Sequence, residues 1–352
     1  GDTIRGDRSH RLRFLARHAI EPGLRHLSVA GGFGMLMMVS LLFAYYAAYD
    51  IALPIPNSFL PAIALLIVAA LTFQAQRFAW STRVRLGSPA RALTSLLLLA
   101  MVCPVLLASG RGMPAPPAST NGQVRVMSYN LHNGFNPLGQ LDLESLAQTI
   151  EAAHVDVVGL QEVSRGWAIN GSVDMFTWLA HRLQMNAVFG PTAGSQWGNA
   201  VLTRLPITSW ENQPLPGEGL LLQRGYLRVE LSASDGKPLT ILNTHYHNPE
   251  NGSLVRQEQS EAILAVASEL TKFMITGDLN AQPGSEEIEM LRRTELRDVL
   301  DIAGETPGYT NPVPEPWRRI DYVWVSEDWI IIDAGVPYTA ASDHLPVTAI
   351  LE

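Results

Sequence analysis

Three long apolar runs in the first third of the chain constrain its fold more than any other feature. They cover residues 29–49, 59–74 and 92–109. A helix that spans a bilayer needs about 20 mainly apolar residues, with a range of about 17–25, so the first and third runs are long enough and the second is short. Core helices of a soluble α domain are the alternative, but such helices carry polar faces. The runs therefore predict a three-helix transmembrane anchor at 28–109.

The placement of arginine predicts how this anchor is oriented. Six arginines precede the first run, four lie between the second and third runs, and the loop 50–58 has no Lys or Arg. Basic residues accumulate on the cytoplasmic side of a membrane. We therefore expect a basic cytoplasmic N-terminus at 1–27. Three crossings then place the rest of the chain outside the cytoplasm, in a periplasmic, extracellular or lumenal space.

The remainder of the chain has a different composition. Residues 110–122 form a Pro/Gly-rich segment typical of a linker. Residues 1–120 contain 11 arginines and four acidic residues, so the rest, with 14 basic and 29 acidic residues, has a formal charge of −15 within a total of −8. Nucleic-acid affinity depends on Lys and Arg, so this balance disfavours a nucleic-acid partner. The single cysteine, Cys103, excludes an intrachain disulfide framework and a Cys-rich zinc site.

Residues 123–352 alternate between strand and helix patterns. Short apolar runs predict strands, and amphipathic segments predict helices at 142–153, 176–183 and 253–270. The predicted strands are 124–129, 155–160, 199–203, 225–231, 239–244, 273–276, 320–325 and 347–351. This order is typical of a layered α/β domain.

Polar residues with metal-binding side chains recur beside these apolar strands. In chain order they are Asn130, Glu162, Asn199, His245, Asp278, Asn280, Asp321, Asp343 and His344. Strand ends on one edge of a sheet converge in space. Carboxylate and amide oxygens with two imidazoles suit Mg²⁺, Mn²⁺ or Ca²⁺ better than a dedicated zinc cage. Each motif alone is most often a turn or a solvated strand end, so the ordered series carries the prediction.

This ordered series resembles the endonuclease/exonuclease/phosphatase superfamily of Mg²⁺-dependent phosphoesterases. The resemblance covers residues 123–352 and implies a four-layer α/β sandwich, in which two packed mixed β-sheets are flanked by helices. A narrower resemblance covers 133–174 and 196–207. These segments look like the phosphatase-like domain of membrane proteins that remodel the lipid of glycosylphosphatidylinositol (GPI) anchors.

The superfamily pattern implies roles for two groups of residues. Glu162 matches the metal-ligating Glu of a Gln-Glu motif, with Asn130 and Asp343 beside the metal. His344, in a Ser-Asp-His motif, matches the histidine that acts in proton transfer at phosphorus. Asp321 matches the carboxylate partner that holds this imidazole and stabilises its protonated form.

Three more matches complete the catalytic set. Asp278 matches the residue that orients or deprotonates the attacking water, and Asn280 matches a donor to the phosphoryl oxygens. His245 matches the second histidine of the nuclease and sphingomyelinase branches. Members of the superfamily differ over which group is the acid and which is the base, so the pattern implies a constellation rather than individual proton transfers.

Three residues are further candidates for substrate binding: Asn199, His247 and Arg319. Asn199 belongs to the same polar series. His247 lies two residues from His245, on the same side of the strand. Arg319 precedes the strand that carries Asp321, and pairing with a carboxylate is the alternative role for its guanidinium.

These expectations predict a membrane-anchored, metal-dependent phosphodiesterase or phosphatase that acts outside the cytoplasm. The predicted tether, the acidic domain and the GPI-remodelling-like segments favour a lipid-linked or headgroup phosphoester as substrate. One alternative is a membrane-tethered extracytoplasmic nuclease, which a few local arginines and a metal would suffice to support. Another is a non-catalytic partner in lipid remodelling, although the complete set of catalytic residue types argues against it.

Overall fold

The chain divides into two compact units, Gly1–Leu106 and Leu107–Glu352. The computed structural model describes residues 31–41, 63–64, 66–67, 70, 122–167, 170–217, 222–233 and 235–352.

In the first unit, the described residues are helical and fall within the first two apolar runs. Helix 31–41 exposes Phe33, Met35 and Leu36. No helix formed by the described residues is both long enough and apolar enough to cross a bilayer. The third apolar run, the basic segment 1–27 and residues 110–121 of the linker lie outside the described residues.

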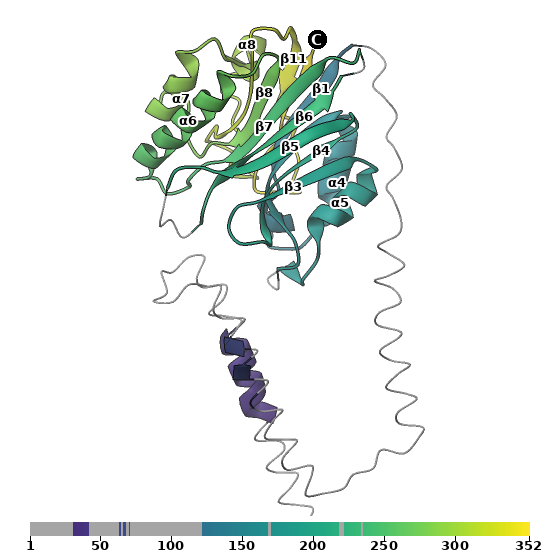
Figure 1. The fold of residues 1–352 in the computed structure, drawn as a ribbon, viewed down its shortest axis with the longest axis vertical. Helices are drawn as coiled ribbons and strands as arrows, with labels where there is room; N and C mark the ends of the chain where they lie inside the picture. The colour runs from purple at the N-terminus through teal and green to yellow at the C-terminus, as the bar shows by residue number, and fades with distance from the viewer. Residues whose placement is uncertain are drawn as a thin grey trace, which may run out of the picture. The chain divides into compact units, whose positions relative to one another are not determined.

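Two six-stranded sheets form the centre of the second unit (Figure 1). The strands of the first sheet are, in spatial order, β11 (Ile331–Gly335), β12 (Val347–Leu351), β1 (Val124–Asn130), β2 (Val157–Ser164), β4 (Trp197–Thr203) and β3 (Asn186–Pro191). Those of the second are β5 (Ile207–Pro214), β6 (Gly225–Ser232), β7 (Pro238–His245), β8 (Phe273–Asp278), β10 (Asp321–Val325) and β9 (Arg297–Asp298). Parallel and antiparallel pairs occur in both, so both sheets are mixed.

Helices cover the outer faces of the two sheets. Apolar residues of α4 (Leu143–Ala152) and α5 (Met175–Leu183) pack on the first sheet. Residues of α6 (Ser253–Ala267) and α7 (Glu286–Arg292) pack on the second. Figure 1 shows these two pairs of helices on opposite sides of the sheets. The predicted four-layer α/β sandwich is therefore confirmed for residues 122–352.

The short helices have local roles. The five-residue α8 (Val299–Ala303) contacts β10 of one sheet and β11 of the other, and a 3₁₀ turn, η1 (His132–Gly134), follows β1. Side-chain caps fix the starts of the two helices on the first sheet. Asp142 accepts a hydrogen bond from the Ser145 backbone N–H at 3.0 Å, and Asp174 accepts one from Thr177 at 3.0 Å. Both caps satisfy amide groups that a helix start leaves unpaired.

The central layer is mainly apolar, and it includes a polar junction at Asn243. Valine, leucine and isoleucine side chains of both sheets fill it, as in other face-to-face sheet packings. At the junction, Asn243 of β7 accepts hydrogen bonds from Gln161 Nε2 at 2.7 Å and Thr276 Oγ1 at 3.1 Å. Its amide nitrogen donates to the carbonyls of Leu160 at 2.8 Å and Ala200 at 2.9 Å. One buried side chain therefore joins three strands of the first and second sheets to its own.

Gly159 allows the sheets to approach this closely. A Cβ atom at this position would lie 2.1 Å from Thr276 Oγ1 and 2.7 Å from Asn243 Oδ1. No side chain fits at such distances, so the contact requires glycine.

Candidate active site

Strand direction brings the predicted polar series to one end of the sandwich. In the first sheet, β1 and β2 are parallel, and Asn130 is level with Gln161, the residue before Glu162. In the second sheet, His245 of β7 is level with Asp278 of the parallel β8. The antiparallel β10 begins at Asp321, which also pairs with Asp278. The strand ends of both sheets thus contribute to one site.

A buried pair of residues, His344 and Asp321, lies at the centre of this site. His344 Nδ1 lies 2.8 Å from Asp321 Oδ2, and its other ring nitrogen lies 3.8 Å from Asp278 Oδ2. His245 Nε2 lies 3.5 Å from the same Asp278 oxygen. Asn130 Nδ2 also donates to that oxygen, at 3.0 Å. The structure therefore brings together five of the residues predicted from the sequence.

Burial and neighbouring charge act in opposite directions on the pKa of His344. Burial favours the neutral imidazole, but the Asp321 carboxylate, with Asp278 and Asp343, outweighs it and raises the pKa to about 10. His344 is therefore an imidazolium at neutral pH in the metal-free protein. A cation held in this position can stabilise negative charge on a bound oxyanion or donate a proton to it.

Asp278 has the opposite role in proton transfer. Burial, reinforced by the charge of Asp321, raises the pKa of its carboxyl group to about 7. A general base works best when its pKa is close to the operating pH. Asp278 is thus suited to accept a proton from a water molecule near neutrality.

Arg224, which the sequence analysis did not select, holds the second histidine. Its guanidinium Nη1 lies 3.0 Å from His245 Nδ1 and its Cζ lies 5.3 Å from the centroid of the Trp197 ring. Since a guanidinium only donates, His245 Nδ1 accepts and Nε2 carries the hydrogen of the neutral ring. Burial and the nearby Arg224 charge hold the pKa of His245 well below its usual value, so the ring is neutral.

Glu162 is half-buried at the rim of the site. A register shift between Leu160 and Val163 in the pairing of β2 with β4 surrounds it, and its φ is +54°. Asn133, also missed from the sequence, donates to Glu162 Oε2 at 3.0 Å and accepts from Trp197 Nε1 at 2.8 Å. Asn133 therefore fixes one carboxylate oxygen of Glu162.

Asp343 lies in the loop between β11 and β12, shortly before β12 begins. Its carboxylate lies 3.5 Å from the ring of His132, and its backbone carbonyl accepts from Val313 N at 2.9 Å. The neighbouring Ser342 hydroxyl donates to the carbonyl of Asn130 at 2.8 Å. This bond places Asp343 close to Asn130.

The remaining predicted residues differ in their surroundings. Asn280 donates to the Tyr246 carbonyl at 3.1 Å, and its backbone N–H donates to Asp278 at 2.9 Å. Asn199 is buried and donates to the Gly225 carbonyl at 3.0 Å, whereas its Oδ1 has no partner among the described residues. His247 is half-buried, and its pKa is lowered first by burial and then by the charges of Arg224 and Arg256.

Arg319 is held apart from the cluster by two carboxylates. Its guanidinium pairs with Asp298 and lies 2.7 Å from Asp301 Oδ1. In the part of the chain that the structure describes, the ion pairs of Arg319 include no member of the predicted site. Arg319 therefore pairs with carboxylates, which is the alternative to its predicted role in substrate binding.

The donors at this end of the sandwich fit a hard divalent cation. Asp278, Asp321 and His344 have one potential ligand atom each within 4.8 Å of the others, and Asp321 Oδ1 is buried without a hydrogen-bond partner among the described residues. A protonated His344 has no free lone pair, so beside an imidazolium the carboxylate oxygens are the donors that fit a cation. Glu162 and Asp343 add carboxylate oxygens at the rim. Oxygen-rich sets of this kind suit Mg²⁺, Mn²⁺ or Ca²⁺.

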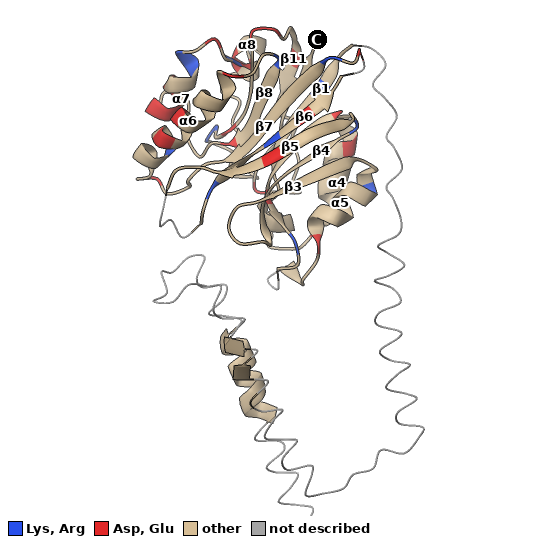
Figure 2. Ribbon diagram, viewed as in Figure 1, with Lys and Arg blue, Asp and Glu red and all other residues tan. Residues whose placement is uncertain are grey.

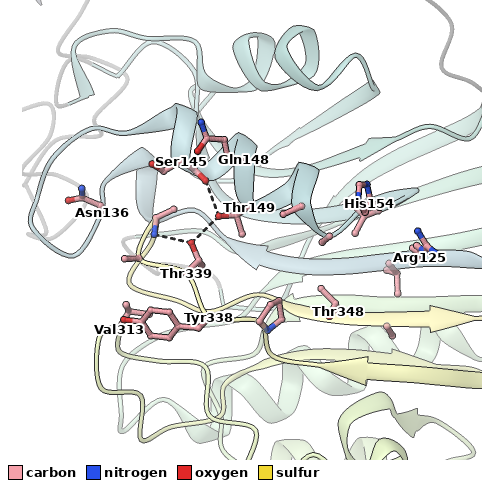
Figure 3. Close-up of a pocket in the computed structure, with 18 of the residues that line it drawn as sticks. Arg125, Asn136, Ser145, Gln148, Thr149, His154, Val313, Tyr338, Thr339 and Thr348 are labelled. Carbon is pink, nitrogen blue, oxygen red and sulfur yellow. Dashed lines mark hydrogen bonds between the residues drawn. The ribbon is translucent and has the colours of Figure 1, made fainter.

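A separate hollow of about 1130 Å³ lies beside α4, along β1 and β12 (Figure 3). Figure 3 shows Thr149 of α4 bonded to Thr339, and these hydroxyl oxygens are 2.9 Å apart. Of the described residues that line this hollow, none belongs to the His344–Asp278 cluster. The cluster therefore forms a site of its own.

The two packed sheets with a His-Asp cluster at their strand ends define an α/β phosphoesterase-type domain. A sequence model of the Endonuclease/Exonuclease/phosphatase family matches residues 127–344, and the chain belongs to this family, whose members are generally phosphoester hydrolases. The predicted superfamily is thus confirmed.

Known proteins are similar to this chain in sequence or in fold. The chain is 23% identical over 256 residues to the Escherichia coli uncharacterized protein YbhP, covering 66% of this chain and 98% of YbhP. An endonuclease/exonuclease/phosphatase from Beutenbergia cavernae has a similar fold, with 26% identity, a TM-score of 0.56, and coverage of 65% of this chain and 71% of that one. A mannosyl-6-phosphatase from Bacteroides thetaiotaomicron shares the fold at 20% identity and a TM-score of 0.55, covering 65% and 99%.

Proposed function

We propose that the chain is a divalent-metal-dependent phosphoesterase, with Mg²⁺ as the favoured metal. The observation that carries this proposal is the buried His344–Asp321 pair, in which His344 Nε2 lies 3.8 Å from Asp278 Oδ2. The pair lies at the same end of the sandwich as Glu162. Phosphoester hydrolysis needs a base for the water and a cation near the phosphoryl oxygens. This arrangement supplies both.

Each side chain has a role that follows from its surroundings. Asp278 orients the attacking water and takes its proton. The His344 imidazolium, held by Asp321, stabilises charge on the phosphoryl group, and the Nε2–H of His245 offers a neutral donor near the same Asp278 oxygen. Glu162, with Asn130 and Asp343, would hold a divalent cation that offsets negative charge on the phosphoryl oxygens.

We assign the substrate to the class of lipid-linked or headgroup phosphoesters, reached from a membrane anchor outside the cytoplasm. The apolar runs at 29–49, 59–74 and 92–109 support the anchor, and so do the exposed apolar side chains of helix 31–41. The arginine pattern supports a cytoplasmic N-terminus. The GPI-remodelling-like segments support a phosphoester on a glycolipid, and the sugar phosphatase among the structural neighbours is compatible with such a headgroup.

The charge of the domain argues against a nuclease. In Figure 2, Lys and Arg are interspersed with acidic residues over the second unit. The formal charge beyond residue 120 is −15, from 14 basic and 29 acidic residues. Since neutralisation of phosphates by Lys and Arg supplies most nucleic-acid affinity, a lipid substrate is favoured over DNA or RNA.

A substrate panel tests this proposal. The purified chain is offered bis-p-nitrophenyl phosphate, glycosylphosphatidylinositol vesicles and plasmid DNA, each with Mg²⁺ and with EDTA. We expect Mg²⁺-dependent hydrolysis of the model ester and the glycolipid, and its loss in His344→Ala. Cleavage of plasmid with intact glycolipid would replace the lipid substrate by a nucleic acid. No turnover with Mg²⁺, Mn²⁺ or Ca²⁺, with lipid binding retained, would favour the non-catalytic partner.

A further inference from the structure

Arg224 is a buried cation without a carboxylate partner. It is 2% exposed, and the other two arginines that are buried among the described residues are both paired. Arg256 lies 2.6 Å from Glu287, and Arg319 pairs with Asp298 and Asp301. Among the described residues, no carboxylate forms an ion pair with Arg224, and its Nε has no hydrogen-bond partner. A buried charge is costly unless it is compensated. The charges of Glu162 and Asp278 act on this guanidinium without an ion pair to it in the described part of the chain, so its remaining donors are available to a bound anion.

The surroundings of Arg224 indicate that an anion bound to it would lie in the site. One face of the guanidinium lies over Trp197, which stacks on Trp167 with ring centroids 6.2 Å apart. Trp197 also donates to Asn133, the residue that holds Glu162. On the other side, Arg224 contacts His245, which borders Asp278. Arg224 therefore lies between the Glu162 half and the Asp278 half of the site, where a phosphoryl group would bind.

From this geometry we propose that Arg224 binds a phosphoryl oxygen of the substrate and fixes the hydrogen of His245 on Nε2. The inference rests on the proposed phosphoesterase function and assigns two tasks to one side chain. The guanidinium is planar and matches the geometry of phosphate oxygens. Its contact at Nη1 occupies His245 Nδ1, so the imidazole presents Nε2–H toward Asp278.

Phosphate binding is the direct test. Inorganic phosphate is titrated calorimetrically into the purified chain, with and without Mg²⁺, and the same variants are assayed on bis-p-nitrophenyl phosphate. Arg224→Met is expected to weaken phosphate binding about tenfold or more, as for a lost hydrogen bond to a charged group. Arg224→Lys retains the charge and is expected to recover part of the affinity while leaving the Nε2–H preference of His245 weakened. Nitrogen-15 NMR of the histidine rings reads that preference directly.

Arg228 provides the matched control. It lies four residues further along the chain, in β6, and pairs with Glu230 at 2.7 Å and Glu211 at 3.4 Å. Arg228→Met should leave phosphate affinity, KM and the tautomer of His245 unchanged.

The outcomes separate this inference from the proposed function. Wild-type phosphate affinity in both Arg224 variants, or no phosphate binding by an active wild-type chain, would overturn the inference and leave the phosphoesterase intact. Arg224-dependent phosphate binding without turnover of any ester would support the inference and contradict the proposed activity. If Arg224→Met does not fold, the Lys variant alone decides, because a purely structural cation would restore both readouts to wild-type values.

Discussion

The two buried histidines of the site differ in charge because their Nδ1 atoms have opposite partners. The Asp321 carboxylate faces His344 at 2.8 Å, whereas the Arg224 guanidinium faces His245 at 3.0 Å. The first contact stabilises an imidazolium and the second a neutral ring. Two residues of one type thus supply a cation and a neutral donor near one oxygen of Asp278.

Sequence reasoning found the groups whose chemistry is visible in a motif and missed those whose role depends on a contact. Glu162, Asp278 and His344 stand beside apolar strands in recognisable short motifs. Asn133 and Arg224 act through partners at distant positions in the chain, which no spacing reveals. The available signal for Arg224 was its place directly before the buried strand β6, in line with the rest of the polar series.

Asn133 supplies a prediction at the residue scale. Asn133→Ala removes the 3.0 Å hydrogen bond to Glu162, so the carboxylate loses its fixed orientation. Partners of this kind typically change metal affinity by about 10–100-fold. We expect Mn²⁺ affinity, measured by electron paramagnetic resonance, to fall in that range, with turnover largely recovered at saturating metal. Gln140→Ala, an exposed change in the same loop, should alter neither.

At the scale of elements, the spacing of apolar residues correctly predicted the helices and strands that have one apolar face. The helices predicted at 142–153 and 253–270 correspond to α4 and α6. The strand predicted at 155–160 continues to Ser164, because β2 remains paired with β4 beyond the register shift. The site carboxylate Glu162 therefore lies within a strand rather than after it.

The strands that went unpredicted lie at sheet edges. β5 is largely exposed and reads Ile-Thr-Ser-Trp-Glu-Asn-Gln-Pro, without alternation of apolar and polar residues. β11 is only partly buried, with Ala334 its one buried residue, and β9 has only two residues. An edge strand has one neighbour and little buried surface, so its sequence is weakly constrained.

The junction between the sheets gives a prediction at the element scale. Asn243→Leu keeps the branching and the number of heavy atoms of the side chain but removes four hydrogen bonds and leaves the side chains of Gln161 and Thr276 buried with fewer partners. We expect the free energy of unfolding to fall by about 2–4 kcal/mol, since each buried group left unsatisfied costs about 1–3 kcal/mol. Urea denaturation measures the change. Gln213→Leu, on the exposed face of β5, should change stability by less than about 0.5 kcal/mol.

At the scale of the whole molecule, protonation of the site is coupled to folding. Folding raises the pKa of His344 from 6.5 to about 10 and that of Asp278 from 3.8 to about 7, so the folded state binds protons more tightly than the unfolded state. Stability from His344 is therefore complete below pH 6.5 and is lost as the pH rises toward 10. The contribution of Asp278 has the same sign but a lower range: it is complete below pH 3.8 and is lost as the pH rises to about 7.

This coupling predicts a specific pH dependence of thermal unfolding. In EDTA, the melting temperature of the wild-type chain should decline from pH 6.5 to about 10 more steeply than that of His344→Gln. Calorimetry of both proteins across this range gives the comparison. Parallel curves would contradict a raised pKa for His344, whatever their absolute values.

The division of the site between two sheets has a further consequence. Asn130 and Glu162 belong to the first sheet, and His245, Asp278 and Asp321 to the second, with Asn243 joining the sheets below them. A slip of one layer against the other by a fraction of an ångström would separate groups that must act together, while leaving each sheet intact. The rate of hydrolysis therefore reports how well the two layers are aligned. We expect this rate to fall under mild denaturing conditions before the strands themselves unfold.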